Sequence, residues 1–334
     1  MIHNTYKIYN KSRRGELKMK EKITDYNGLF ITQRADPYIM KHTDGYYYFT
    51  ASVPSFDRII LRRSKTIEGL KEAEEVTIWR AHERGIMGAH IWAPEIHYLD
   101  GKWYIYFAAG ETENIWNIRP YVLESKEENP CTGNWIELGM MQPSDDDEFS
   151  FRAFSLDATV FEHKGKRYYV WAEKVGVGKQ ISNLYISEME TPNKLKTVQV
   201  LLTTPDYDWE RKGFWVNEGP AILKGNGKLF LTYSASATDE NYCMGMLEID
   251  EKEDILDPRA WKKSRYPVLK TAEEKGIFGP GHNSFVKAED GVTDLCIYHA
   301  RPYKGYIGGA LSDPNRHAMI MKVEWVDGAP TFTY

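Results

Sequence analysis

Three acidic residues and one histidine stand at the same place in a recurring sequence pattern. Asp36, Glu218 and His282 each precede a glycine by nine residues, and Asp157 in "SLDATVF" precedes one by eight. Carboxyl groups gathered in one pocket can divide acid and base work, because a negative neighbour raises the pKa of a second carboxyl until it keeps its proton. An acid that opens an apolar β-run, as Asp157 does, therefore predicts a strand whose first residue faces a pocket.

The glycines themselves mark a repeat along the chain. Each opens an aromatic run such as "DGKWYIYFAAG", and each follows a short apolar run such as "PEIHYL". Asp-Gly or Asn-Gly between two β-rich runs is a strong hairpin signal, because both central residues of a type I′ turn need positive φ. The predicted hairpin tips are 56, 64, 62 and 64 residues apart, at Gly45, Gly101, Gly165, Gly227 and Gly291.

Five such copies, each with room for about four antiparallel strands, predict an all-β fold, a five-bladed β-propeller. A β-sandwich with similar hairpins is the alternative, and the near-constant spacing disfavours it. We expect residues 28–334 to form this single domain and residues 1–27 to form a basic leader that is poorly ordered or loosely packed. The pattern leaves open whether "YNGLFIT" or the last blade's own strands close the ring.

A propeller would bring the chemically capable residues together. The innermost strand of each blade runs along the central channel, so equivalent positions meet at one mouth. The three acids would then lie beside His282 and Trp92, a set typical of a sugar-cleaving pocket rather than of a packed core. Taken singly, Asp36 fits a turn initiator before proline, Asp157 fits a strand edge, and Glu218 fits an exposed loop, as does His282. The shared register favours one common site.

Composition argues against several classes of function. The net charge of −5, without a basic stripe among the aromatic residues, argues against nucleic-acid binding. No run of about 18 apolar residues predicts a membrane span. The cysteines are odd in number and lack C-x-x-C spacing, which indicates neither a disulfide framework nor a zinc site. The basic N-terminal run lacks the apolar core of a secretory signal, so we expect a cytoplasmic location.

Six motifs carry a resemblance to a known family. In order, "RADPYI", "IWAPEIHYLDGKWYIYFAA", "SLDATVF", "NEGPAIL", "GPGHNSF" and "YHAR" resemble glycoside hydrolase family 43, the α-L-arabinofuranosidases, arabinanases and β-xylosidases built on five-bladed propellers. The resemblance covers residues 28–334 and implies an inverting mechanism. It implies Asp36 as general base, Glu218 as general acid, and Asp157 as the residue that orients the acid and raises its pKa. Inversion needs about 6.5–9.5 Å between acid and base, which leaves room for a water molecule.

The resemblance also implies which residues contact the sugar. Trp92 and the adjacent Ala93 would form a platform for the sugar ring. Phe154 and Trp215 are further pocket candidates, and blade packing is the alternative for each. Arg301 in "YHAR" resembles an arginine that contacts the sugar or a catalytic acid, and a surface arginine with a buried stem is its alternative reading.

No cofactor is required for the chemistry that the resemblance implies. It places His282 at the centre of the channel, beside a calcium or other ion held largely through water. A lone histidine is also commonly just hydrogen-bonded, so both interpretations stay open.

The substrate class is inferred from what the sequence lacks. Many β-xylosidases of this family append a β-sandwich, and no such extension is seen here. We therefore expect an α-L-arabinofuranosidase that acts on arabino-oligosaccharides, arabinan or arabinoxylan fragments. A β-xylosidase, an endo-arabinanase and a carbohydrate-binding propeller without catalysis are the alternatives. A cytoplasmic location would favour exo action, but the sequence leaves exo and endo action open, as it does the oligomeric state.

Overall fold

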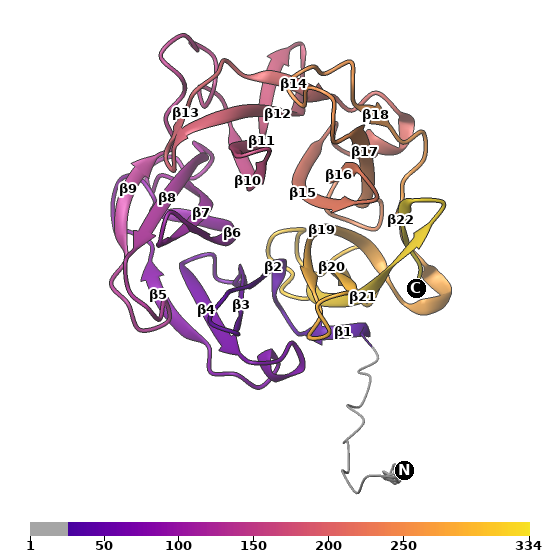
Figure 1. Ribbon diagram of the computed structural model, residues 1–334, viewed down its shortest axis with the longest axis horizontal. Coiled ribbons are helices and arrows are strands. Elements are labelled where there is room, and N and C mark those ends of the chain that lie inside the picture. The colour runs from indigo at the N-terminus through magenta and orange to yellow at the C-terminus, as the bar shows by residue number, and fades with distance from the viewer. Residues whose placement is uncertain (1–25) are drawn as a thin grey trace, which may run out of the picture.

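The computed structural model describes residues 26–334, which form five antiparallel sheets around a central channel (Figure 1). The predicted five-bladed β-propeller is confirmed. The expected leader, residues 1–27, lies outside the described residues except for Tyr26 and Asn27. No helix in the described part of the chain is long and apolar enough to cross a membrane.

The first three blades follow one another in sequence order. Blade 1 contains β2 (Ala35–Lys41), β3 (Tyr47–Ser52), β4 (Arg58–Ser64) and β5 (Val76–Arg80). Blade 2 contains β6 (Ala89–Leu99), β7 (Lys102–Gly110), β8 (Arg119–Ser125) and β9 (Ile136–Met140). Blade 3 contains β10 (Ser155–His163), β11 (Lys166–Val177) and β12 (Lys179–Thr191), with β13 (Lys194–Leu195) and β14 (Val200–Thr203) both paired to β12.

The last two blades complete the ring. Blade 4 contains β15 (Asn217–Gly225), β16 (Lys228–Ala235), β17 (Cys243–Asp250) and β18 (Lys262–Lys263). Blade 5 contains β19 (Phe278–Lys287), β20 (Asp294–Arg301) and β21 (His317–Val326), with β1 (Asn27–Ile31) and β22 (Ala329–Phe332) both paired to β21. Short 3₁₀ turns lie in the connections, at η1 (Glu68–Leu70), η2 (Asp208–Glu210) and η3 (Glu273–Lys275).

The ring is closed by β1, whose sequence "NGLFI" precedes blade 1 in the chain. It pairs antiparallel with β21, where Asn27 lies opposite Met321 and Leu29 opposite Met319. Figure 1 shows the indigo β1 beside β21 of the last blade. The N-terminal segment therefore supplies a strand to blade 5, which answers the question that the sequence left open.

The hairpin tips follow the predicted turn chemistry at three of the five glycines. Positive φ occurs at both central residues of the turns that hold Gly101, Gly165 and Gly227, as a type I′ turn requires. At Gly45 and Gly291, only the glycine has positive φ. All five glycines still connect the first and second strands of a blade, so the repeat identified in the sequence marks the true register of the sheets.

Apolar side chains fill the spaces between neighbouring blades. In the described residues, a separate buried cluster lies between each adjacent pair of sheets, including blades 5 and 1. Trp103 lies in the cluster between blades 1 and 2, and Trp171 in the one between blades 2 and 3. Large flat rings bury much apolar area against a facing sheet, which explains why the second strand of each repeat is aromatic.

A bulge opens each innermost strand at the same end of the channel. The first two strands of every blade shift register near the start of the inner strand. One residue at each bulge has a left-handed backbone, with φ between 46° and 56°, namely Asp36, Ala93, Asp157, Gly219 and His282. Bulges turn a side chain out of the regular alternation of a strand, so each repeat presents a re-aimed residue at the mouth.

The backbone N–H of four of these bulge residues is bound by a side chain of the preceding blade. Asp36 N donates to His299 Nδ1 at 3.1 Å, and Ala93 N donates to Ser52 Oγ at 2.8 Å. His282 N donates to Ser234 Oγ at 2.6 Å, and Gly219 N donates to Asp157 Oδ2 at 3.1 Å. The bulges are thus held by contacts between blades as well as within them.

Removal of the Phe30 ring should weaken ring closure. The Phe30 side chain is buried among residues of blades 1 and 5, whereas the neighbouring Leu29 is 52% exposed. Phe30→Ala should lower the free energy of unfolding by about 3–5 kcal/mol, and Leu29→Ala should change it little. Scanning calorimetry of both variants checks this. Equal thermal midpoints would show that β1 does not contribute to closure.

Candidate active site

A cavity of about 550 Å³ opens at the mouth of the channel where the bulges lie. Asp36, Asp157, Glu218 and His282 line it, and they come from β2, β10, β15 and β19. The cavity wall also includes the rings of three residues named from the sequence, Trp92, Phe154 and Trp215. Four blades thus bring together residues that are up to 246 positions apart in the chain, from 36 to 282.

Asp36 is surrounded by groups that favour its charged form. Ser52 Oγ donates a hydrogen bond to Asp36 Oδ2 at 2.6 Å, and Arg316 Nη1 lies 3.6 Å from Oδ1. His282 Nδ1 lies 3.3 Å and His299 Nδ1 3.2 Å from the same oxygen. Burial by itself raises the pKa of Asp36, but the interactions with His282 and Arg316 outweigh burial and hold that pKa well below its usual range. Asp36 is therefore a carboxylate at neutral pH.

His299 is a neutral support for this carboxylate. Burial lowers the pKa of His299 to about 4, and its Nδ1 accepts the backbone N–H of Asp36. The ring stacks on Tyr242, with centroids 5.6 Å apart and planes 2° apart. The imidazole therefore fixes the backbone of Asp36 rather than competing for its proton.

Asp157 and Glu218 form the second part of the site, and both are protected from solvent in the cavity wall. Burial raises the pKa of both carboxyls, and their mutual repulsion together with the charge of Asp36 raises the pKa of Asp157 further. Tyr242 OH donates to Glu218 Oε1 at 2.8 Å, and Gly219 N donates to Asp157 Oδ2. Both carboxyls therefore favour their protonated forms more than ordinary carboxyls do.

The site therefore contains a carboxylate and a proton donor at the same cavity. The pKa of Asp36 is lowered, while the pKa values of Asp157 and Glu218 are raised. Pairs of carboxyls whose surroundings separate their pKa values are suited to simultaneous base and acid catalysis. Such an arrangement can activate a water molecule on one side of a substrate and protonate a leaving oxygen on the other.

His282 lies between the two parts of this carboxyl cluster. Its Nδ1 is 3.3 Å from Asp36 Oδ1 and 3.6 Å from Asp157 Oδ2. Among the described residues, no group of three or more His, Cys, Asp or Glu side chains is placed to hold a metal ion. These donors thus form no direct ligand set, and an ion held through water beside His282 stays a prediction.

Two residues expected to contact the sugar do not line the cavity. Ala93 is buried, and its contribution is a backbone N–H that donates to Ser52, the residue that in turn donates to Asp36. Arg301 is buried beneath the cavity wall, where it donates to the carbonyl oxygens of Thr238 and Ala310. Direct contact of either residue with the sugar stays a prediction, and the contacts that the structure shows are supporting ones.

The arginine beside Asp36 is Arg316. It lies in the connection from β20 to β21, which also contributes Gly309, Ala310, Leu311 and Ser312 to the cavity wall. This connection is organised by the buried Asp313, which accepts hydrogen bonds from Tyr303 OH and from Ile307 N. Arg316 stands outside the hairpin register, so the repeat gave no signal for it.

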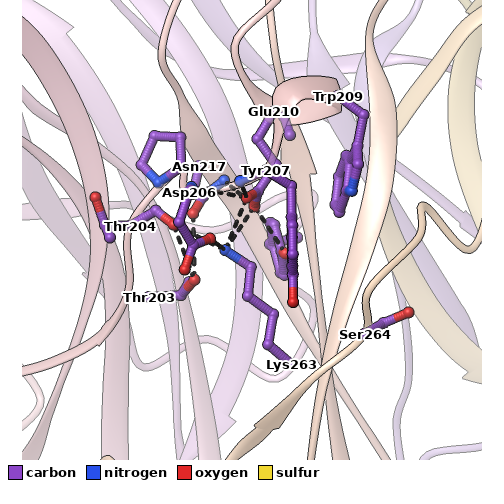
Figure 2. A network of polar contacts seen from close by, with 12 residues as sticks. Thr203, Thr204, Asp206, Tyr207, Trp209, Glu210, Asn217, Lys263 and Ser264 are labelled. Atoms are coloured by element: carbon purple, nitrogen blue, oxygen red, sulfur yellow. Dashed lines mark hydrogen bonds and ion pairs between the residues drawn. The ribbon is translucent and has the colours of Figure 1, made fainter.

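A second buried network supports the strand that carries Glu218 (Figure 2). The Glu210 carboxylate is fully buried and accepts hydrogen bonds from Asn217 Nδ2 and Tyr233 OH, each at 2.9 Å. Lys263 Nζ lies 2.9 Å from Glu210 Oε2. Because Asn217 immediately precedes Glu218, this ion pair fixes the start of β15. It was missed from the sequence, since Glu210 in η2 and Lys263 in the two-residue β18 both lie outside the hairpin pattern.

Comparisons with known proteins identify one family and several similar proteins. The family described as Glycosyl hydrolases family 43 matches residues 27–330. An extracellular exo-α-(1→5)-L-arabinofuranosidase of Streptomyces avermitilis is 51% identical over 301 residues, which are 90% of this chain and 61% of that protein. A protein of the same description from Streptomyces chartreusis is 50% identical over 283 residues, covering 85% of this chain and 84% of that one.

A solved structure is similar over nearly the whole fold. The crystal structure of an α-L-arabinofuranosidase from Lactobacillus brevis matches with a TM-score of 0.86 and 52% identity, over 92% of this chain and 96% of that one. The chain spans only 61% of the length of the Streptomyces avermitilis protein. The expected cytoplasmic location is contradicted, because both Streptomyces relatives are described as extracellular.

Loss of the Tyr242 hydroxyl should move the alkaline side of the pH–rate profile. The hydroxyl donates to Glu218 and so favours its charged form. Tyr242→Phe should therefore raise the pKa of Glu218, and the alkaline limb of kcat/KM should shift upward by about one pH unit. The profile is measured with a glycoside that has a sugar leaving group, because such a leaving group needs the proton of the acid.

Tyr104→Phe is the matched control, because Tyr104 OH donates to Glu124 outside the cavity. Its alkaline limb should coincide with that of the unmodified protein. A downward shift in Tyr242→Phe, or none, would contradict the assignment of that limb to Glu218.

Proposed function

The chain belongs to glycosyl hydrolases family 43, and on that premise we propose that it is an inverting α-L-arabinofuranosidase. The observation that carries the proposal is that three buried carboxyls line one cavity. Their surroundings lower the pKa of Asp36 and raise the pKa values of Asp157 and Glu218. A module that only binds carbohydrate would have no reason to bury three carboxyls together, because each costs free energy unless it is compensated.

In the proposed mechanism, Asp36 is the general base. Its carboxylate removes a proton from a water molecule as that water attacks the anomeric carbon. Ser52 and Arg316 orient and charge-balance the carboxylate before the reaction, so little reorganisation is needed when the proton moves.

Glu218 is the proposed general acid, and Asp157 is its positioning residue. Glu218 donates its proton to the glycosidic oxygen while the bond to the anomeric carbon breaks. Asp157 accepts Gly219 N–H and so fixes the backbone next to Glu218, and its carboxyl disfavours a second negative charge nearby. The sugar leaves with the opposite anomeric configuration, because water and leaving group occupy opposite faces.

The proposed substrates are arabino-oligosaccharides, arabinan or arabinoxylan fragments that end in an α-L-arabinofuranosyl residue. The names of the similar proteins support this sugar and support exo action. The wall contributed by Gly309–Ser312 also supports a pocket bounded on one side rather than an open cleft. Trp92, which lines the cavity near Asp36, offers an apolar ring face to the sugar.

Substitution of the two catalytic residues should give different substrate dependence. Glu218→Gln should lose roughly 10²- to 10⁴-fold in kcat on an arabino-oligosaccharide, and much less on an aryl arabinoside, whose leaving group hardly needs a proton. Asp36→Asn should lose activity on both substrates. Asp100→Asn, which alters a carboxyl at a far hairpin tip, is the control. Near-normal turnover by Asp36→Asn would refute its role as base.

The sugar and the stereochemistry can be tested together. A panel of p-nitrophenyl α-L-arabinofuranoside, p-nitrophenyl β-D-xyloside and linear α-1,5-arabino-oligosaccharides should show the arabinosides cleaved first. A proton NMR time course on an arabinoside should show the β-anomer as the initial product. Preference for the xyloside would disprove the proposed sugar, and initial release of the α-anomer would disprove inversion.

A further inference from the structure

The two sides of the cavity mouth differ in charge. On the blade 2 side, the rings of Trp92 and His90 stack with centroids 4.3 Å apart, and Trp116 packs beside them. Burial lowers the pKa of His90, so this aromatic side is uncharged at neutral pH. These uncharged rings do not distinguish a neutral sugar from an anionic one.

The adjoining side, on blades 3 and 4, carries aromatic rings covered by cations, and its Phe154 packs against the same cluster as Trp92. Lys174 Nζ lies 3.8 Å from the ring centroid of Phe154. Lys179 Nζ and the guanidinium carbon of Arg211 each lie 4.5 Å from the ring centroid of Trp215. We call Lys174, Lys179 and Arg211 the cationic wall.

Among the described residues, the cationic wall has no ion-pair partner, although the charge of Lys174 interacts with that of Glu218. In the described part of the chain, none of its three members has a carboxylate within 4.0 Å, whereas Lys263 nearby is paired with Asp206 and Glu210. Cation–π contacts hold these side chains in place without cancelling their charge. A positive field therefore remains at this side of the mouth for an incoming ligand.

The cationic wall stands on the side of the general acid. Ser182 of β12 donates its backbone N–H to Trp215 O at 3.0 Å and its hydroxyl to Asn217 O at 3.3 Å. These bonds join the β11–β12 hairpin, which carries Lys174 and Lys179, to the segment that leads into Glu218. If Glu218 is the proton donor of the proposed function, the leaving group must lie along this side.

We propose that the cationic wall binds a carboxylate on the leaving-group part of an arabinoside. The substrate class favoured by the site would then be anionic arabinosides, in which an α-L-arabinofuranosyl residue is attached to an acidic sugar. This inference rests on the proposed function, because it takes its orientation from Glu218. The rings of Phe154 and Trp215, which lie under the cations, contact the sugar ring, and the cationic wall contacts its acid group.

The test compares substrates that differ only by a carboxylate. Mild oxidation of arabinobiose and arabinotriose converts the reducing end of each into an aldonic acid, which places the charge in the leaving group at two distances. At low ionic strength, kcat/KM should be about threefold to tenfold higher for at least one aldonate than for its neutral parent. This ratio should fall toward one as salt is raised to about 0.5 M.

Charge-removing variants identify the residues responsible. Lys179→Gln and Arg211→Gln should each reduce the aldonate-to-neutral ratio, and the double variant should reduce it further, leaving only the contribution of Lys174. Lys252→Gln removes an exposed lysine that follows β17 at the opposite face and should leave the ratio unchanged. A ratio of one in the unmodified protein, or an unaltered ratio in the double variant, overturns the inference.

Binding measurements test the cationic wall independently of the proposed function. Failure to cleave neutral arabinobiose would count against the arabinofuranosidase activity alone. Calorimetry with Asp36→Asn, which is expected not to turn over, then compares the Kd values of each aldonate and its neutral parent. Tighter binding of the aldonate that is lost in Lys179→Gln supports the cationic wall even if neutral arabinobiose is not cleaved. Equal Kd values for the aldonate and its neutral parent overturn the inference.

Discussion

The active site depends on keeping one buried carboxyl, Asp36, charged beside two others whose pKa values are raised, Asp157 and Glu218. Removing a carboxylate from water is costly unless hydrogen bonds and opposite charge replace the solvent. Asp36 receives that replacement from Ser52, Arg316 and His282. Asp157 and Glu218 are compensated less fully, and burial raises the pKa of both. The division of labour between base and acid thus follows from unequal compensation across one cavity.

The bulges explain why one backbone position recurs in every blade although the residues that occupy it differ in chemistry. Left-handed φ is best tolerated by glycine, and Asp, Asn and His follow among the other residues. Asp36, Asp157 and His282 occupy that conformation directly, whereas blade 4 uses Gly219 and places its acid one residue earlier, at Glu218. Blade 2 uses Ala93, whose side chain is too small for acid–base chemistry. The same backbone conformation therefore presents the proposed base, the proposed positioning acid, a histidine and the neighbour of the proposed proton donor.

The sequence predicted the parts of the site that share this register and missed the parts that do not. Counting back from the hairpin glycines identified Asp36, Asp157 and His282 because a bulge fixes their distance from the turn. Arg316 belongs to a loop whose shape depends on Asp313 and Arg301, and no local pattern specifies where such a loop folds back. Contacts made by irregular connections must be seen in three dimensions.

Ring closure and the site are linked by the same contacts between blades. The N–H of Asp36 in blade 1 is held by His299 of blade 5, and the N–H of Ala93 in blade 2 by Ser52 of blade 1. Blade 5 is itself completed by β1, which precedes blade 1 in the chain. A rotation of blade 5 against blade 1 would therefore move His299 relative to the general base. Since buried hydrogen bonds are strongly directional, the closed ring is what keeps the carboxyl cluster in register.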